Sequence, residues 1–153
     1  MGRPTMKSVL FACNLNSVRS PIAAAIARHY FGRRLTVDSA GVEAGELDGF
    51  AIATMVELGI DIAKHRPKTF DQLSEDGALF DLIITLSPEA HHRALEFARG
   101  GNAEVEYWPT QDPTLAIELG LSREGILSSY RRVRDSLSER ILSRLGMGPL
   151  GNL

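Results

Sequence analysis

The sequence has little cysteine, little net charge and no long apolar run. Its 153 residues include one cysteine, Cys13, so the chain can form neither an intramolecular disulfide nor a cysteine-based zinc site. A lone thiol is typical of a reducing compartment, and we therefore expect a cytoplasmic protein. The apolar runs fall far short of the ~20 residues of a membrane span, and the first residues lack the apolar core of a signal peptide. We expect neither a membrane partner nor a secretory leader.

The charges of the chain nearly cancel. Lys and Arg number 17 and Asp and Glu 19, which leaves a formal net charge of −2. This balance argues against general nucleic-acid binding, which needs a strong positive field, and leaves room only for a local basic patch. The apolar fraction of 44% and the charged fraction of 24% are typical of a folded domain rather than a disordered chain. The length predicts a single domain over residues 1–153, because cores divide only beyond about 250–300 residues.

Short apolar runs alternate with longer helical patterns along the chain. The expected strands are residues 8–12, 35–39, 82–86 and 105–108. The expected helices are residues 21–31, 48–58, 88–99 and 123–145, with a short helix in an irregular connection over 63–78 and a loose tail over 148–153. This alternation predicts an α/β fold, in which a four-stranded parallel sheet is flanked by helices on both faces. Ligand sites of such sheets lie beyond the carboxyl ends of the strands.

The segment after the first strand has the pattern of an anion cradle. Cys13 follows this strand, Arg19 comes six positions later, and Ser20-Pro21 opens a helix with Ser20 as the expected N-cap. Backbone N–H groups of a tight loop and the helix N-terminus supply positive potential, and the Arg19 guanidinium can grip two oxygens of a tetrahedral oxyanion. The same field favours the thiolate form of Cys13, which would stand as a nucleophile beside a bound phosphoryl group.

This segment resembles the phosphate loop of the low-molecular-weight protein tyrosine phosphatases and their arsenate-reductase relatives. The similarity extends over nearly the whole chain. The other matching segments are Val37-Asp38-Ser39-Ala40-Gly41, Gly59-Ile60-Asp61 with Lys64-His65-Arg66, Phe80-Asp81-Leu82-Ile83-Ile84 and Asp112-Pro113. The resemblance implies the phosphotyrosine protein phosphatase I-like fold. It also implies hydrolysis of a phosphorylated protein or a small phosphomonoester, with protein phosphotyrosine as the expected substrate and phosphate or another oxyanion bound in the loop.

The resemblance further implies a role for each matching residue. Cys13 is expected to attack phosphorus and carry a phosphocysteine intermediate, Arg19 to orient the transferring group, and Asp112 to act first as acid and then as base. Backbone amides from residue 14 to residue 19 are expected to bind the phosphoryl oxygens. The expected substrate-binding set is Asn14, Leu15, Asn16, Ser17, Val18 and Ser20. Within it, Ser20 would donate to the thiolate and Asn16 would brace the loop. No metal or cofactor is expected, because Arg19 and the amides supply the positive potential.

Two loop positions depart from the family's usual pattern. Leu15 stands where the phosphate loop usually has glycine, so either backbone strain or a different loop path is expected there. Val18 stands where the phosphatases usually carry a second cysteine. No loop disulfide can then protect Cys13, and its overoxidation should be easier.

The aromatic wall that stacks on phosphotyrosine in the phosphatases also departs from the pattern. Thr114 follows Asp112-Pro113, where the phosphatases often have an aromatic residue. Tyr107 and Trp108 precede this loop, and one of them is the remaining candidate for an aromatic edge of the site. Phosphatase chemistry is therefore better supported by the sequence than phosphotyrosine specificity.

Two other functions stay open. An arsenate reductase would bind arsenate in the same cradle, with Cys13 as the nucleophile. A route through several internal cysteines is excluded, whereas a route through an external small thiol is not. A non-catalytic phosphate-binding module would not need the acid, and the joint presence of Cys13, Arg19, Ser20 and Asp112 argues against it. Each of these residues also has a purely structural interpretation, as a buried cysteine, a surface arginine, a helix cap and an Asp-Pro turn.

The remaining titratable clusters have structural interpretations. His91-His92 are expected to be surface residues, because adjacent residues of a helix face different directions. His65 is expected to have a structural or surface role. Arg131-Arg132 with Arg134 is expected to be a solvated face of the last helix, with only a weak indication of a docking patch for an acidic partner.

Overall fold

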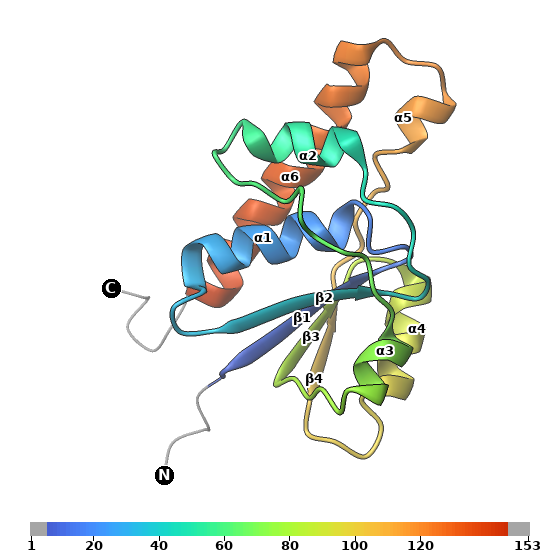
Figure 1. The fold of residues 1–153 in the computed structure, drawn as a ribbon. Coiled ribbons are helices and arrows are strands. Elements are labelled where there is room, and N and C mark those ends of the chain that lie inside the picture. Colours follow the sequence, from blue (N-terminus) through green and yellow to red (C-terminus); the bar gives the residue numbers. More distant parts are fainter. Residues whose placement is uncertain (1–5, 147–153) are drawn as a thin grey trace.

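A parallel sheet of four strands lies between two layers of helices (Figure 1). The computed structural model describes residues 6–146, so the tail expected over 148–153 lies outside the described residues. The strands are β1 (Ser8–Cys13), β2 (Thr36–Gly41), β3 (Leu82–Thr85) and β4 (Glu104–Tyr107), in the spatial order β2-β1-β3-β4. Every neighbouring pair is parallel, which confirms the predicted fold class.

The central strand β1 is buried on both of its faces, as its apolar run predicts. Val9, Phe11 and Cys13 belong to the core on one side of the sheet, and Leu10 and Ala12 to the core on the other. This alternation follows from the two-residue period of a strand. It leaves Cys13 at the carboxyl end of the central strand, facing the larger core.

Three helices cover the larger core and two cover the other face (Figure 1). The first layer holds α1 (Arg19–Phe31), α2 (Gly49–Val56) and α6 (Arg123–Gly146), and the second holds α3 (Phe70–Glu75) and α4 (Pro88–Phe97). The expected apolar stripe of the last helix is confirmed, since Tyr130, Val133, Leu137 and Ile141 are all buried. Within the described residues, no helix is both long and apolar enough to cross a membrane.

One helix is missing from the predicted elements, and one predicted helix cap is wrong. A short helix, α5 (Leu115–Glu118), follows the Asp112 loop and was not expected from the sequence. The prediction that Ser20 caps α1 is wrong, because this helix begins at Arg19 and its N-cap is Val18, which makes no side-chain capping bond. Ser20 therefore lies inside the first turn, where its hydroxyl is free to contact Cys13. Ser87 caps α4, because its hydroxyl accepts a hydrogen bond from the backbone N–H of Ala90.

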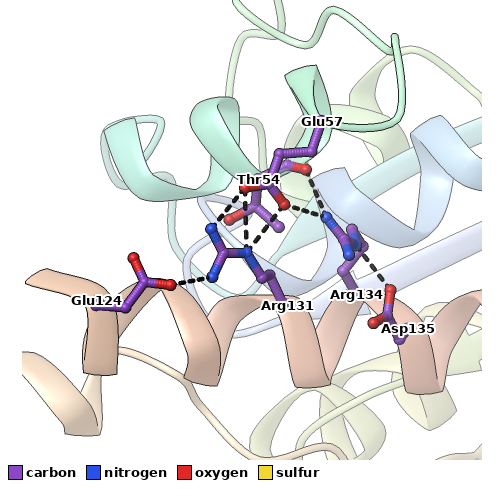
Figure 2. A network of polar contacts seen from close by, with 6 residues as sticks. All are labelled: Thr54, Glu57, Glu124, Arg131, Arg134 and Asp135. Atoms are coloured by element: carbon purple, nitrogen blue, oxygen red, sulfur yellow. Dashed lines mark hydrogen bonds and ion pairs between the residues drawn. The ribbon is translucent and has the colours of Figure 1, made fainter.

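A carboxylate at the C-terminal end of α2 joins two arginines of α6 (Figure 2). Glu57 accepts hydrogen bonds from Arg131 at 2.8 Å and from Arg134 at 2.7 Å, and Arg134 also donates to the backbone carbonyl of Thr54 at 2.9 Å. Arg134 is only 8% exposed. The interpretation of Arg131 and Arg134 as a solvated face is therefore wrong, because both arginines tie α6 to α2.

Glu57→Gln should lower the thermal stability of the fold near neutral pH. Hydrogen bonds from Arg131, followed by those from Arg134, lower the pKa of Glu57 from about 4.5 to about 2. A lowered pKa stabilises the folded state at pH values above the unfolded value of about 4.5, and this stabilisation is lost as the pH falls toward 2. The difference in Tm between wild type and Glu57→Gln should therefore be largest near pH 7 and shrink between pH 4.5 and 2. A difference that stays constant over this range would contradict the ion-pair account.

Candidate active site

The loop that joins β1 to α1 has its carbonyl oxygens turned toward neighbouring segments. Four backbone N–H groups of the 42–48 segment donate to the loop at 2.9–3.2 Å: Val42 to Cys13, Glu43 to Asn14, Gly45 to Leu15 and Asp48 to Ser17. The fifth carbonyl, of Asn16, lies 3.2 Å from Nε2 of His65. The backbone N–H groups of residues 14–18, in contrast, find no hydrogen-bond acceptor within residues 6–146. Because its carbonyl oxygens already accept hydrogen bonds from neighbouring segments, the loop has its backbone N–H groups available for a ligand, as an anion cradle requires.

Gly41 at the end of β2 lets the 42–48 segment approach the loop. A Cβ atom at this position would lie 2.8 Å from both the Asn14 carbonyl oxygen and the Asn16 nitrogen, and 2.4 Å from the Glu43 carbonyl oxygen. These distances are shorter than a side chain can tolerate. The glycine is therefore required by close backbone packing, rather than by an unusual backbone angle.

Asp48 anchors the same segment from its other end. Its carboxylate caps α2, and its second oxygen accepts a hydrogen bond from the Tyr130 hydroxyl at 2.8 Å. Burial and then this hydrogen bond raise the pKa of Tyr130 above its ordinary value, so that the phenol stays a donor. Since the Asp48 backbone also holds the Ser17 carbonyl, the loop is linked through α2 to α6.

Asn16 braces the loop from behind. This side chain is fully buried, and its amide donates to the hydroxyl oxygens of Ser20 at 2.8 Å and Ser39 at 2.9 Å. Its Oδ1 accepts from the Lys68 backbone at 2.9 Å and lies 3.1 Å from His65 Nε2. The asparagine therefore connects the loop to β2 and to the 65–68 segment, which are distant in the sequence.

His65 must donate through Nε2, because both Asn16 atoms that it contacts are acceptors. Burial lowers the pKa of His65, while its hydrogen bond to Asn16 acts in the opposite direction. The expectation of a structural role for His65 is confirmed, and the structure adds that it supports the loop.

Of the two alternatives expected at Leu15, backbone strain is absent, because Leu15 does not adopt the left-handed conformation. Asn16, with a φ of 55°, is the one non-glycine residue within 6–146 that adopts the left-handed conformation. Asparagine tolerates this region better than other side chains, because its short amide bonds locally. The loop thus makes its sharp turn at Asn16, and Leu15 is left 45% exposed on the rim.

Cys13 lies at the floor of the loop, with 2% of its surface exposed. Its Sγ is 2.9 Å from Ser20 Oγ and 3.4 Å from the Ser20 backbone nitrogen. Because Ser20 Oγ already accepts a hydrogen bond from the Asn16 amide, its own hydrogen is available for the sulfur. The sulfur of Cys13 therefore has two hydrogen-bond donors from Ser20, its hydroxyl and its backbone N–H.

Arg19 connects the loop to the acid that follows β4. Its side chain is 9% exposed, its Nη1 donates to the Thr110 carbonyl at 2.9 Å, and its Nη2 lies 3.9 Å from Asp112 Oδ2. The other carboxylate oxygen of Asp112 accepts from the backbone and hydroxyl of Thr114, at 3.0 and 2.7 Å. Asp112 is thus half exposed, with one oxygen held in the turn and the other directed toward Arg19.

The residues of the loop and of the Asp112 turn enclose one pocket of about 400 Å³. It is lined by Cys13, Asn14, Leu15, Ser17, Val18, Arg19, Val42, Glu43, Glu89, Asp112 and Thr114. The structure therefore brings together most of the site residues expected from the sequence. The side chains of Asn16 and Ser20 lie behind the loop instead, where they support Cys13.

Comparison with known proteins assigns the chain to a family. A model of the family described as low molecular weight phosphotyrosine protein phosphatase matches residues 8–143. The chain belongs to this family. Among its relatives, an arsenate reductase of Halalkalibacterium halodurans is 34% identical over 135 residues, which cover 88% of this chain and 92% of the relative.

Two solved structures are similar along nearly their whole length. An arsenate reductase in the phosphate-binding state is 29% identical and gives a TM-score of 0.65. The match covers 89% of this chain and 94% of the reductase chain. A low molecular weight protein tyrosine phosphatase from T. tengcongensis is 25% identical and gives a TM-score of 0.68. The match covers 88% of this chain and 95% of the phosphatase chain. This phosphatase family thus contains cysteine-dependent enzymes of both names, and membership alone does not choose between the two activities.

Among the described residues, no aromatic side chain lines the pocket of this family member. Neither Tyr107 nor Trp108 lines it, so the expectation of an aromatic edge is wrong. Tyr107 stacks on His91 with ring centroids 4.9 Å apart, and Trp108 lies under the guanidinium of Arg140. Both aromatics serve the packing around β4.

The histidine pair of α4 does not form a metal site. His91 hydrogen-bonds to Thr85 at 2.9 Å, and His92 lies on the surface 4.0 Å from Glu96. Within residues 6–146, no three His, Cys, Asp or Glu side chains gather in a way that could hold a metal ion.

Peroxide should inactivate this family member in a way that reductant does not fully reverse. A sulfenic acid formed on Cys13 finds no second cysteine in the chain, since the loop has buried Val18 instead, and further oxidation to the sulfinic acid is open. The test compares the activity recovered with dithiothreitol after increasing exposure, together with the mass of the Cys13 peptide. Val18→Cys should increase the recoverable fraction. Equal recovery of both proteins would contradict the account.

Proposed function

We propose that the protein is a phosphomonoester hydrolase that acts on protein phosphotyrosine through a phosphocysteine intermediate. The observation that carries the proposal is the convergence of three groups around one loop. The Cys13 sulfur lies at its floor, Arg19 at its end, and the carboxylate of Asp112 lies 3.9 Å from that arginine. A nucleophile, an oxyanion binder and an acid are the three parts that the reaction needs.

In the first step, the Cys13 thiolate attacks phosphorus in line with the leaving oxygen. The S–P bond forms as the P–O bond breaks, and Asp112 gives its proton to the leaving oxygen. Arg19 and the N–H groups of residues 14–18 bind the three remaining phosphoryl oxygens, where negative charge is spread in the transition state.

In the second step, water attacks the phosphocysteine from the side that the alcohol has left. Asp112, now a carboxylate, takes a proton from the water, and the S–P bond breaks to release inorganic phosphate. The hydroxyl of Ser20, 2.9 Å from Sγ, stabilises the departing thiolate. Both steps use groups that the fold already holds in place.

The depth of the nucleophile favours phosphotyrosine among phosphorylated side chains. With Cys13 2% exposed below a rim that includes Leu15 and Val42, the phosphorus must enter the pocket on a long stem. A phenyl ring provides that length, whereas the single carbon of phosphoserine holds the peptide backbone against the rim. We therefore expect phosphotyrosine peptides to be hydrolysed faster than matched phosphoserine peptides.

A second candidate function is arsenate reduction with an external thiol, which is favoured by the relatives named arsenate reductase. Arsenate would be esterified on Cys13, after which a small thiol would attack Sγ. This attack forms a mixed disulfide, leaves both electrons of the S–As bond on arsenic and releases arsenite. A relay of disulfides within the chain is not possible, because its 153 residues include one cysteine.

Hydrolysis of p-nitrophenyl phosphate, assayed across pH with a chelator and a reductant present, tests the proposal. We expect turnover without added metal, because Arg19 and the loop amides supply the positive potential. Folded, reduced protein that releases no p-nitrophenol would contradict the proposal. Arsenite formation from arsenate and a small thiol by that same protein would then support the second candidate.

A further inference from the structure

A groove of about 400 Å³ lies beside the catalytic pocket and meets it at Asp112. Residues 109–113 with Leu115 and Ala116 line one part of the groove, and Arg132 and Val133 of α6 line another. Asp112 is the one residue that lines both spaces. Because the proposed acid must reach the leaving oxygen, a leaving group in the pocket lies at the edge of this groove.

The groove is lined by exposed aliphatic side chains. Leu115, Leu119 and Leu121 are 43%, 68% and 45% exposed, and they come from α5 and the turn that follows it. Figure 1 shows α5 projecting from the rest of the molecule beside the start of α6. Large apolar side chains that gather on one surface mark a place where another molecule binds.

One cation of the groove has no acidic partner. Arg131 and Arg134, on either side of Arg132 in the sequence, are paired with Glu57, whereas Arg132 makes no ion pair with any residue from 6 to 146. Arg132 is exposed and lines the groove together with the leucines. The groove therefore combines an apolar surface with one positive charge that is available to a ligand.

We propose that this groove binds the polypeptide segment next to the phosphorylated side chain of a protein substrate, with an aliphatic residue on the leucines and an acidic residue against Arg132. The inference rests on the proposed function and adds to it the recognition of the residues around the phosphotyrosine. A small phosphomonoester fills the pocket and does not extend over α5. The groove therefore affects the rate for peptides and not the rate for p-nitrophenyl phosphate.

A charge reversal tests this assignment. The substrates are phosphotyrosine peptides that have one aliphatic residue next to the phosphotyrosine. In each peptide a single position carries either Glu or Lys, and this position is varied along the series on both sides of the phosphotyrosine. We expect wild type to prefer the Glu peptides in kcat/KM by about fivefold at the best position, as for an exposed ion pair. Arg132→Glu should reverse this preference, and Leu119→Ser should lower kcat/KM for both peptides. Neither change should alter kcat/KM for p-nitrophenyl phosphate.

Two matched variants separate local recognition from general effects. Arg33→Glu makes the same charge change in the turn before β2, at the opposite end of the sheet, and Leu79→Ser removes a leucine that is 86% exposed just before β3. Neither should change the peptide preference. An unchanged preference in Arg132→Glu, an equal shift in Arg33→Glu, or a parallel loss of p-nitrophenyl phosphate turnover would overturn the inference. Failure of wild type to hydrolyse p-nitrophenyl phosphate would instead overturn the proposed function on which it rests.

Discussion

Serine in place of Cys13 is expected to abolish phosphatase turnover, by on the order of 10⁴-fold or more, as when the nucleophile of another covalent hydrolase is removed. A serine hydroxyl at this position is a much weaker nucleophile than a thiolate in the field of Arg19 and the loop amides. It would also be a far poorer leaving group in the second step. Steady-state hydrolysis of p-nitrophenyl phosphate measures the loss.

The fold and the anion cradle should survive this substitution. Only one atom changes, and Ser20 can still donate to the new oxygen from its place inside α1. Calorimetry should therefore show that Cys13→Ser binds inorganic phosphate and unfolds at nearly the wild-type temperature. Turnover that persists in the folded variant would exclude Cys13 as the nucleophile.

Asp112→Asn should lower kcat/KM by about 10²–10³-fold for alkyl and phenyl phosphates and much less for p-nitrophenyl phosphate, because general acid catalysis matters most for a basic leaving oxygen. The amide can still accept from Thr114, so the turn should keep its shape. A series of aryl phosphates gives the measurement, since kcat/KM reports the step in which the leaving group departs.

Glu89→Gln is the matched control for this experiment. Glu89 is an exposed carboxylate that lines the same pocket and makes no ion pair within residues 6–146. Its removal changes the pocket's charge by the same amount without touching Arg19. The slope of log kcat/KM against leaving-group pKa should steepen in Asp112→Asn and keep its wild-type value in Glu89→Gln. Equal slopes in all three proteins would contradict an acid role for Asp112.

The features that the sequence predicts well depend on neighbours along the chain. The continuous apolar runs of β1 and β3 predict strands that are buried on both faces, and the apolar stripe of α6, at helical spacing, predicts the buried face of that helix. The spacing from Cys13 to Arg19 and the Ser-Pro pair after it place the loop between strand and helix. These local signals were enough for the fold class and for the position of the cradle.

The features that the sequence does not predict depend on contacts between distant segments. Ser20 is a residue type that often caps helices, but its hydroxyl contacts Cys13 and Asn16 instead, and the helix begins two residues earlier than expected. The support of Asn16 by His65 joins residues 49 positions apart.

Leu15 and Arg134 show the same dependence on tertiary contacts. The left-handed turn of the loop falls at Asn16, whose amide contacts fix it, rather than at Leu15, where the family pattern placed a glycine. Arg134 lies in a row of charged residues that is typical of an exposed helix face. Its guanidinium nevertheless donates to the carbonyl of Thr54 and the carboxylate of Glu57, so Arg134 is buried where α2 packs on α6 (Figure 2).

Trapping of the phosphorylated enzyme tests the central claim most directly. In Asp112→Asn, p-nitrophenyl phosphate should still phosphorylate Cys13, because its leaving group needs little acid, whereas the hydrolysis of phosphocysteine loses its base. Acid quenching during turnover, followed by mass spectrometry, should therefore find one phosphoryl group on the peptide that contains Cys13, and none in the Cys13→Ser variant. Release of p-nitrophenol without any covalent phosphoryl group, or a phosphoryl group on another residue, would contradict the mechanism.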